Sequence, residues 1–119
     1  MKNREQQPDD LLPLTPAVFH ILLALADGEK HGYGIMQEVK AITKGEIAMG
    51  PGTLYGSIKR MLVSDLIIET DERPDPALDD ERRRYYKLTP FGERVVAAEA
   101  RRLMNLVGVA QSKQLLGPA

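Results

Sequence analysis

Positive charge is concentrated in one short segment of a chain that is almost neutral overall. The formal net charge of the 119 residues is −1, yet three consecutive arginines interrupt the segment DDERRRYYKLTP at residues 79–90. The planar guanidinium group of arginine can hold phosphate oxygens in pairs or enter a narrow minor groove. We therefore expect nucleic acid to contact the arginines of this segment, which are Arg82, Arg83 and Arg84.

A solvated, charged surface is the alternative for the same segment, because charged side chains on proteins mostly face water. If the segment forms a strand, alternate side chains point to opposite faces. Arg83 would then point away from Arg82 and Arg84. The segment by itself leaves both interpretations open.

A second pair of cations lies in the segment TLYGSIKRMLVSDL, residues 53–66, whose apolar side chains recur at helical spacing. On a helical wheel, Lys59 and Arg60 share the polar face with Gly52 and Gly56. Inside a helix, glycine costs about 1 kcal/mol relative to alanine. Cations alone would fit an ordinary surface, but glycines beside them indicate a face that closely approaches a rigid surface.

Composition limits the kinds of function that the chain can carry. A hydrophobic fraction of 43% and a charged fraction of 28% are typical of a single globular domain. The sequence has no cysteine, which excludes disulfides, thiol nucleophiles and Cys-based zinc sites. No apolar run approaches the roughly 20 residues of a membrane helix. The polar N-terminus lacks a signal-type segment, so we expect a cytoplasmic protein without membrane contact.

The cationic segments belong to a regular succession of predicted elements. Helices are predicted over residues 16–26, 34–44 and 53–66, and Thr15 and Pro16 supply the start signals of the first. Strands are predicted within residues 66–70 and 83–88, joined by an acidic loop that contains prolines. The LTP motif of the first helix recurs at residues 88–90 and opens a long last helix that ends near residue 114.

This order predicts a mainly α fold with a small β-ribbon, a winged helix-turn-helix followed by a C-terminal dimerisation helix. We expect a flexible arm over residues 1–13, a winged-helix DNA-binding domain over 14–88, and the dimerisation helix with its tail over 89–119. In this fold the third helix enters the major groove, and the ribbon, or wing, lies along the DNA backbone. The last helix is longer than the domain can cover, so its apolar side should meet a second copy.

The segments HGYGIMQEV, PGTLYGSIKRML and RRRYYKLTPFGE, in this order and spacing, resemble the PadR family of bacterial transcriptional regulators. The resemblance covers about residues 14–110, and the length resembles the short subfamily, in which a single C-terminal helix mediates dimerisation. It implies a homodimeric repressor whose third helix reads an inverted repeat in double-stranded DNA.

Together, the cationic pattern and the resemblance predict a DNA-binding site. Tyr33, Thr53 and Tyr55 match family positions near DNA, and we expect Lys59 to read a base edge. For the tyrosines, the alternative is a ring packed in the core with only its hydroxyl outside. The predicted DNA-binding set is Tyr33, Gly52, Thr53, Tyr55, Gly56, Lys59, Arg60, Arg82, Arg83 and Arg84. The predicted dimer interface consists of Val96, Leu103, Leu106, Val107 and Ala110.

The sequence also departs from the family pattern. Asp65 stands where members often have glycine, and aspartate tolerates the left-handed backbone conformation better than most residues. Val63 stands where members often have glutamate. The predicted wing loop is unusually acidic, so phosphate should repel its tip, which argues against deep insertion into the minor groove.

Other chemistry has little support in the sequence. His20 in the first helix and His31 in the following turn have no companion ligands at metal-binding spacing, so we expect neither a metal nor a cofactor. No serine has the context of a nucleophile, and we expect no enzyme. Some family members bind hydrophobic or phenolic compounds at or near the dimer interface, so the resemblance also allows a small effector of that kind. The alternative to DNA binding is a winged-helix module for protein interaction or ligand sensing.

Overall fold

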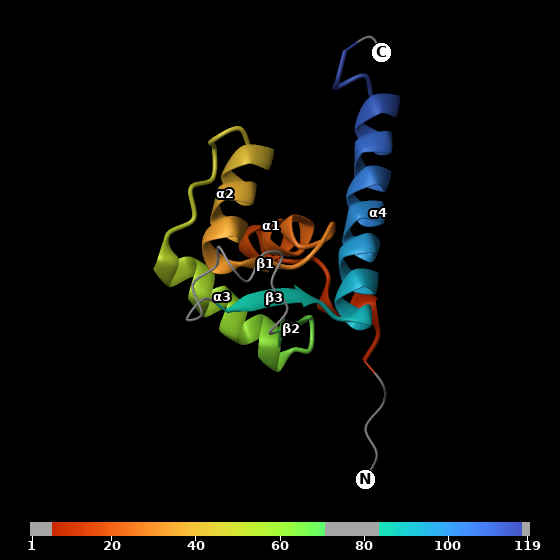
Figure 1. Cartoon of the computed structure of the whole chain (residues 1–119). Coiled ribbons are helices and arrows are strands. Elements are labelled where there is room, and N and C mark those ends of the chain that lie inside the picture. Colours follow the sequence, from red (N-terminus) through yellow and green to blue (C-terminus); the bar gives the residue numbers. More distant parts are fainter. Residues whose placement is uncertain (1–5, 71–83, 118–119) are drawn as a thin grey trace.

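A computed structural model of the chain describes residues 6–70 and 84–117. Within these residues, four α-helices surround a three-stranded antiparallel sheet, and a short 3-10 helix precedes them (Figure 1). The predicted fold class, mainly α with a small β-ribbon, is confirmed. In chain order the elements are η1 (Pro8–Leu11), α1 (Pro16–Ala24), β1 (Lys30–His31), α2 (Gly32–Ile42), α3 (Pro51–Val63), β2 (Ile67–Thr70), β3 (Tyr85–Leu88) and α4 (Pro90–Ser112).

The sheet has the strand order β1-β3-β2. The predicted ribbon is the β2–β3 pair, in which Ile67 lies opposite Leu88 and Thr70 lies opposite Tyr85. Strand β1, which was not predicted, pairs His31 with Tyr85 on the other edge of β3. A strand of two residues is too short to show an alternating pattern, and it forms only because β3 offers it a partner.

Both LTP motifs start helices as predicted. The Thr15 hydroxyl accepts a hydrogen bond from the Val18 amide at 3.2 Å, and the Thr89 hydroxyl accepts one from the Gly92 amide at 2.8 Å. These hydrogen bonds satisfy amides that have no partner inside the first helical turn. In each case a proline follows in the first turn, where its missing N–H costs nothing.

One hydrophobic core joins helices α1, α2 and α3 to the sheet and to the first half of α4. Val96, which we predicted at the dimer interface, lies in this core and is buried by its own subunit. The apolar side of α4 is continuous, and its first turns face inward rather than toward a partner. The most deeply buried aliphatic side chains are those of Ile21, Leu22, Ile35, Val39, Leu54 and Val95.

The described part of the predicted N-terminal arm differs from a loose segment. Residues 8–11 form η1, and Leu11, Leu12 and Leu14 pack against the core. The Leu14 amide donates a hydrogen bond to Glu99 Oε2 at 2.9 Å, which ties this segment to α4. Residues 1–5 of the predicted arm lie outside the described residues.

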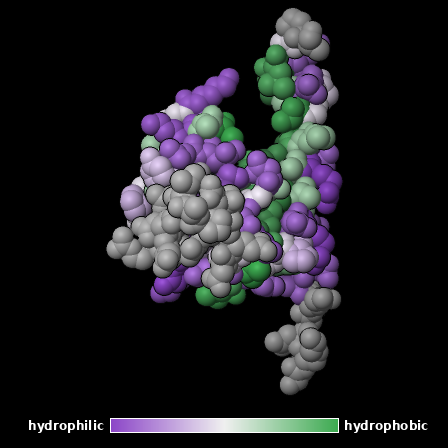
Figure 2. Space-filling view, viewed as in Figure 1, coloured by the Kyte–Doolittle hydropathy of each residue, from purple (hydrophilic) through white to green (hydrophobic). Residues whose placement is uncertain are grey.

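Helix α4 stands at one side of the domain, and its last turns extend beyond the other elements (Figure 1). In the described part of the chain no helix is both long enough and apolar enough to span a bilayer. In Figure 2 the far turns of α4 show an apolar surface on the side that faces the domain. Leu106, Val107 and Val109 of α4 are exposed, so the fold leaves apolar side chains of this helix uncovered.

Candidate nucleic-acid interface

Helix α3 has one buried face and one open face. Leu54, Ile58 and Met61 are buried in the core. On the opposite side, Gly52 and Lys59 are exposed, and Gly56 is half-buried. Thr53 and Arg60 are exposed at one edge of this open face, so the structure brings most of the predicted helix-three residues together on one surface.

The neighbours of Gly52 and Gly56 within the described chain do not explain why these positions are glycine. A β-carbon added at Gly52 would meet no atom within 4 Å, and one added at Gly56 would meet only Arg60 Nη1, at 3.7 Å. The Arg60 guanidinium also donates a hydrogen bond to Ser57 Oγ at 3.3 Å, so it folds back beside Gly56. Close approach to an external surface therefore stays our prediction for these glycines.

Tyr55 lies at the other edge of the open face, where α3 meets the start of α2. Its side chain is 47% exposed, and its hydroxyl lies against Gly32. A β-carbon at Gly32 would overlap that hydroxyl and would stand 2.8 Å from the Tyr55 Cζ atom. The alternative of a ring packed in the core with only its hydroxyl outside does not hold, because the hydroxyl is the end that packs on Gly32 while much of the ring stays open. A DNA contact by Tyr55 stays a prediction. Gly32 was not among the predicted site residues, and only its place in the HGYG motif could have indicated it.

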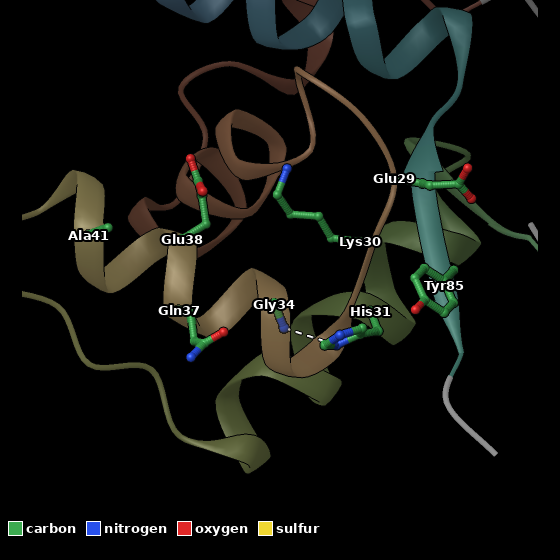
Figure 3. Close-up of a pocket in the computed structure, with 8 residues that line it drawn as sticks. All are labelled: Glu29, Lys30, His31, Gly34, Gln37, Glu38, Ala41 and Tyr85. Atoms are coloured by element: carbon green, nitrogen blue, oxygen red, sulfur yellow. Dashed lines mark hydrogen bonds between the residues drawn. The ribbon is translucent and has the colours of Figure 1, made fainter. Parts of the chain in front are cut away.

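His31 connects the start of α2 to the sheet. Its Nδ1 atom accepts a hydrogen bond from the Gly34 amide at 3.0 Å and thereby caps α2 (Figure 3). The imidazole ring also contacts Tyr85 edge-to-face, with ring centroids 5.3 Å apart. An open groove of about 470 Å³ lies beside these residues, between α2 and β3. With His31 as its N-cap, helix α2 starts at Gly32, two residues earlier than predicted.

Tyr33 follows on the first turn of α2 and is 56% exposed. Its ring stacks on that of His31, with an interplanar angle of 10° and centroids 6.4 Å apart. The ring is thus held in place while its surface remains accessible. This arrangement suits a side chain that contacts a phosphate group beside α3.

The ribbon contributes one described arginine. Arg84 is exposed, and its Nη1 atom donates to Glu69 Oε2 on the neighbouring strand at 3.3 Å. An exposed ion pair of this kind contributes little to stability, so DNA phosphate can compete for the guanidinium. Arg82 and Arg83 lie outside the described residues.

The tyrosines of β3 serve the core of the ribbon rather than its surface. Tyr85 and Tyr86 are both buried. Burial raises the pKa of the Tyr86 phenol, and the charge of Glu69 acts in the same direction. Tyr86 is therefore a neutral phenol at physiological pH.

The predicted left-handed residue is confirmed at the end of α3. Asp65 has a φ of 62°, and the Leu66 amide donates to the Met61 carbonyl at 2.9 Å across this turn. The left-handed residue ends the helix and directs the chain into β2.

The remaining predicted dimer residues lie in the second half of α4. Leu103 and Ala110 are half-buried, while Leu106 and Val107 are exposed. Exposed Val109, Leu115 and Leu116, which the prediction did not include, extend the same end of the chain.

The structure offers no metal centre within its described residues. No group of three or more His, Asp or Glu side chains is close enough to hold an ion there. His20 donates to the Pro16 carbonyl inside α1, and His31 is engaged in capping.

Comparisons with known proteins agree with this geometry. The profile of the transcriptional regulator PadR-like family matches residues 21–98. The chain is 32% identical over 87 residues to the transcriptional regulator Rv3488 of Mycobacterium tuberculosis, an alignment that covers 73% of this chain and 75% of that protein.

A further relative is longer than this chain. The chain is 33% identical over 88 residues to an uncharacterised 37.1 kDa protein of transposon TN4556 from Streptomyces fradiae, covering 74% of this chain and 23% of the relative. It therefore spans about a quarter of that relative's length. Among solved structures, a PadR family transcription regulator from Clostridium difficile R20291 has the same fold, with a TM-score of 0.68 and 24% identity over 87% of this chain and 100% of that one.

Proposed function

Since the chain belongs to the PadR-like family of transcriptional regulators, we propose that it is a repressor that binds an inverted-repeat DNA operator as a homodimer. The family consists of regulators rather than enzymes. The observation that carries the proposal is the open face of α3, where the exposed Lys59 and Arg60 lie beside two residues without side chains.

In the proposed complex, α3 lies in the major groove. Lys59 and Arg60 reach base edges there, since guanine presents two acceptors to a basic side chain. Tyr33 and Thr53 contact the phosphates on either side of α3, and Arg84 leaves Glu69 to bind the backbone beside the ribbon. Phosphate contacts fix the position of the protein, and base contacts provide its sequence preference.

The second half of α4 supports the homodimer. Its apolar stripe leaves the domain and has no cover within the described subunit, as an interface helix requires. Two copies joined through α4 would place their α3 helices in successive major grooves, about 34 Å apart.

Selection from a random DNA pool tests the function directly. We expect the wild-type protein to select an inverted repeat and to lose affinity steeply with salt, because bound cations release counterions from DNA. Lys59→Ala should weaken binding to the selected duplex roughly tenfold, in line with one base contact. Lys113→Ala, at an exposed position just after α4, is the control and should bind like the wild type.

The measurement is a fluorescence-anisotropy titration of each protein at two salt concentrations. If no sequence is enriched and affinity does not respond to salt, the DNA-binding function is wrong, and the winged helix is a protein-interaction module instead.

A further inference from the structure

One valine stands out on the open face of α3. Val63 is 84% exposed, more than any other large hydrophobic side chain in the described part of the chain. A β-branched residue also loses side-chain freedom in a helix and gains nothing from it when no neighbour packs on it. Contacts among the described residues therefore do not explain a valine at this position.

The position of Val63 on the helix is informative. Gly52, Gly56, Lys59 and Val63 follow each other at spacings of four, three and four residues, which places them along one line of α3. Side chains on a helix lean toward its N-terminus, so the valine methyl groups lie over the turn that carries Lys59. The two glycines have no side chains that would hold the first half of this line away from a surface. A side chain as short as valine can therefore reach a surface on which α3 lies.

The charge of α3 identifies that surface. Lys59 and Arg60 lie one turn before the valine, and α3 contains no acidic residue, although the exposed Asp65 follows its end. An exposed apolar group next to two cations fits a polyanion that itself offers an apolar group. The major groove of DNA has this character, since the thymine C5-methyl is the apolar group on the base edges there.

We propose that Val63 is a specificity-determining residue whose methyl groups pack on the C5-methyl of one thymine in each half-site. This inference rests on the proposed function and adds to it which base the far end of α3 recognises. The expected readout is a preference for thymine over any base that lacks the methyl group at that position.

Replacing thymine by deoxyuridine tests the contact, because this change removes the methyl group and keeps every hydrogen-bonding group. The probe is the duplex selected by the wild-type protein, with each thymine replaced in turn. At one position per half-site we expect a loss of affinity of about fourfold, the value of one buried methyl group. Val63→Ala should bind the thymine and deoxyuridine duplexes equally well.

A matched control is Ile68→Ala. Ile68 is an exposed β-branched residue too, but it lies on β2 and not on α3. This variant should keep the full discrimination between thymine and deoxyuridine. Circular dichroism of both variants checks that the fold is retained.

The outcomes separate the inference from the function on which it rests. If the wild type selects DNA but no thymine methyl contributes, or if the methyl effect persists in Val63→Ala, the role of Val63 is wrong and the repressor stands. If the wild type selects no sequence at all, both proposals are overturned.

Discussion

Gly92 has the least room for change of any glycine in the described chain. A β-carbon at this position would overlap the Leu66 carbonyl oxygen and would stand 3.0 Å from the Leu66 carbonyl carbon. The same carbonyl oxygen accepts hydrogen bonds from the Thr89 amide and hydroxyl, at 3.1 Å and 3.2 Å. Backbone atoms held in this way cannot move aside, so the start of α4 and the start of β2 fit together only with glycine.

Gly92→Ala should therefore lower the free energy of unfolding by at least about 2 kcal/mol, the cost of overpacking a rigid site. Gly108→Ala, on the same helix, is the control, because a β-carbon at Gly108 meets no neighbouring atom within 4 Å. We expect it to leave stability unchanged or raise it by up to about 1 kcal/mol, through helix propensity. Urea denaturation of both variants measures the difference, and equal stability of the two would contradict the predicted overlap.

Single residues were predictable where local chemistry determines their role. Thr15, Thr89 and Asp65 were identified correctly, since capping and left-handed turns depend on immediate neighbours. Gly32 and Gly92 were missed because each accommodates an atom from a distant part of the chain. No spacing rule reveals such a contact before the fold is known.

At the scale of elements, Glu99 joins the segment before α1 to α4. Its side chain is only 2% exposed, and its carboxylate accepts hydrogen bonds from the Leu14 amide at 2.9 Å and from Arg102 Nε at 2.6 Å. The hydrogen bond from Arg102 lowers the pKa of Glu99, and the Leu14 amide adds to this, against the opposing effect of burial. The ionised form therefore stabilises the junction.

Glu99→Gln should reduce stability at neutral pH by about 2 kcal/mol, the worth of a charged hydrogen bond. Because the pKa is lower in the folded state, the unfolded chain takes up the proton first as pH falls. The stabilisation is thus complete above the ordinary glutamate pKa of about 4.3, and it disappears as pH falls through the lower folded value. Urea midpoints of the wild type and the variant between neutral and acid pH measure this convergence.

Glu46→Gln, at an exposed position after α2, is the control for this series and should change little at any pH. A Glu99→Gln deficit that stays constant down to acid pH would contradict the role of the ionised carboxylate.

Elements with strong periodicity were predicted well, whereas short elements that depend on tertiary contacts were not. The four long helices and the ribbon were found, with ends displaced by a few residues. The two missed elements, η1 and β1, have four and two residues. Both exist because a neighbour, α4 or β3, offers them a surface, and such neighbours cannot be read from local sequence.

At the scale of the whole molecule, the proposed dimer uses the exposed end of α4 as its interface. Leu106 is 53% exposed on the line of α4 that continues the buried stripe, whereas Met104 is 70% exposed on the opposite side of the helix. We expect Leu106→Glu to give monomers in analytical ultracentrifugation, because a carboxylate cannot be buried unpaired in an apolar interface. Met104→Glu should remain a dimer.

A dimer that survives Leu106→Glu, or one that is lost only in Met104→Glu, would place the interface elsewhere.

The family and the winged-helix arrangement were predicted from the sequence, since motif order and helix order both point to them. The division of α4 between core and exposed end was not predicted, because a continuous apolar stripe does not show where the subunit ends. Val96, which was predicted at the dimer interface, is buried within its own subunit.

A single residue, Thr89, separates the last residue of β3 from the first residue of α4. The ribbon and the long helix therefore turn almost as one rigid body, and α4 acts as a lever arm of roughly 34 Å, at 1.5 Å per residue. A tilt of about 5° at the ribbon would carry the far end of the helix through about 3 Å. In the proposed dimer, the position of the wing of one subunit on DNA would thus determine where the other subunit can reach.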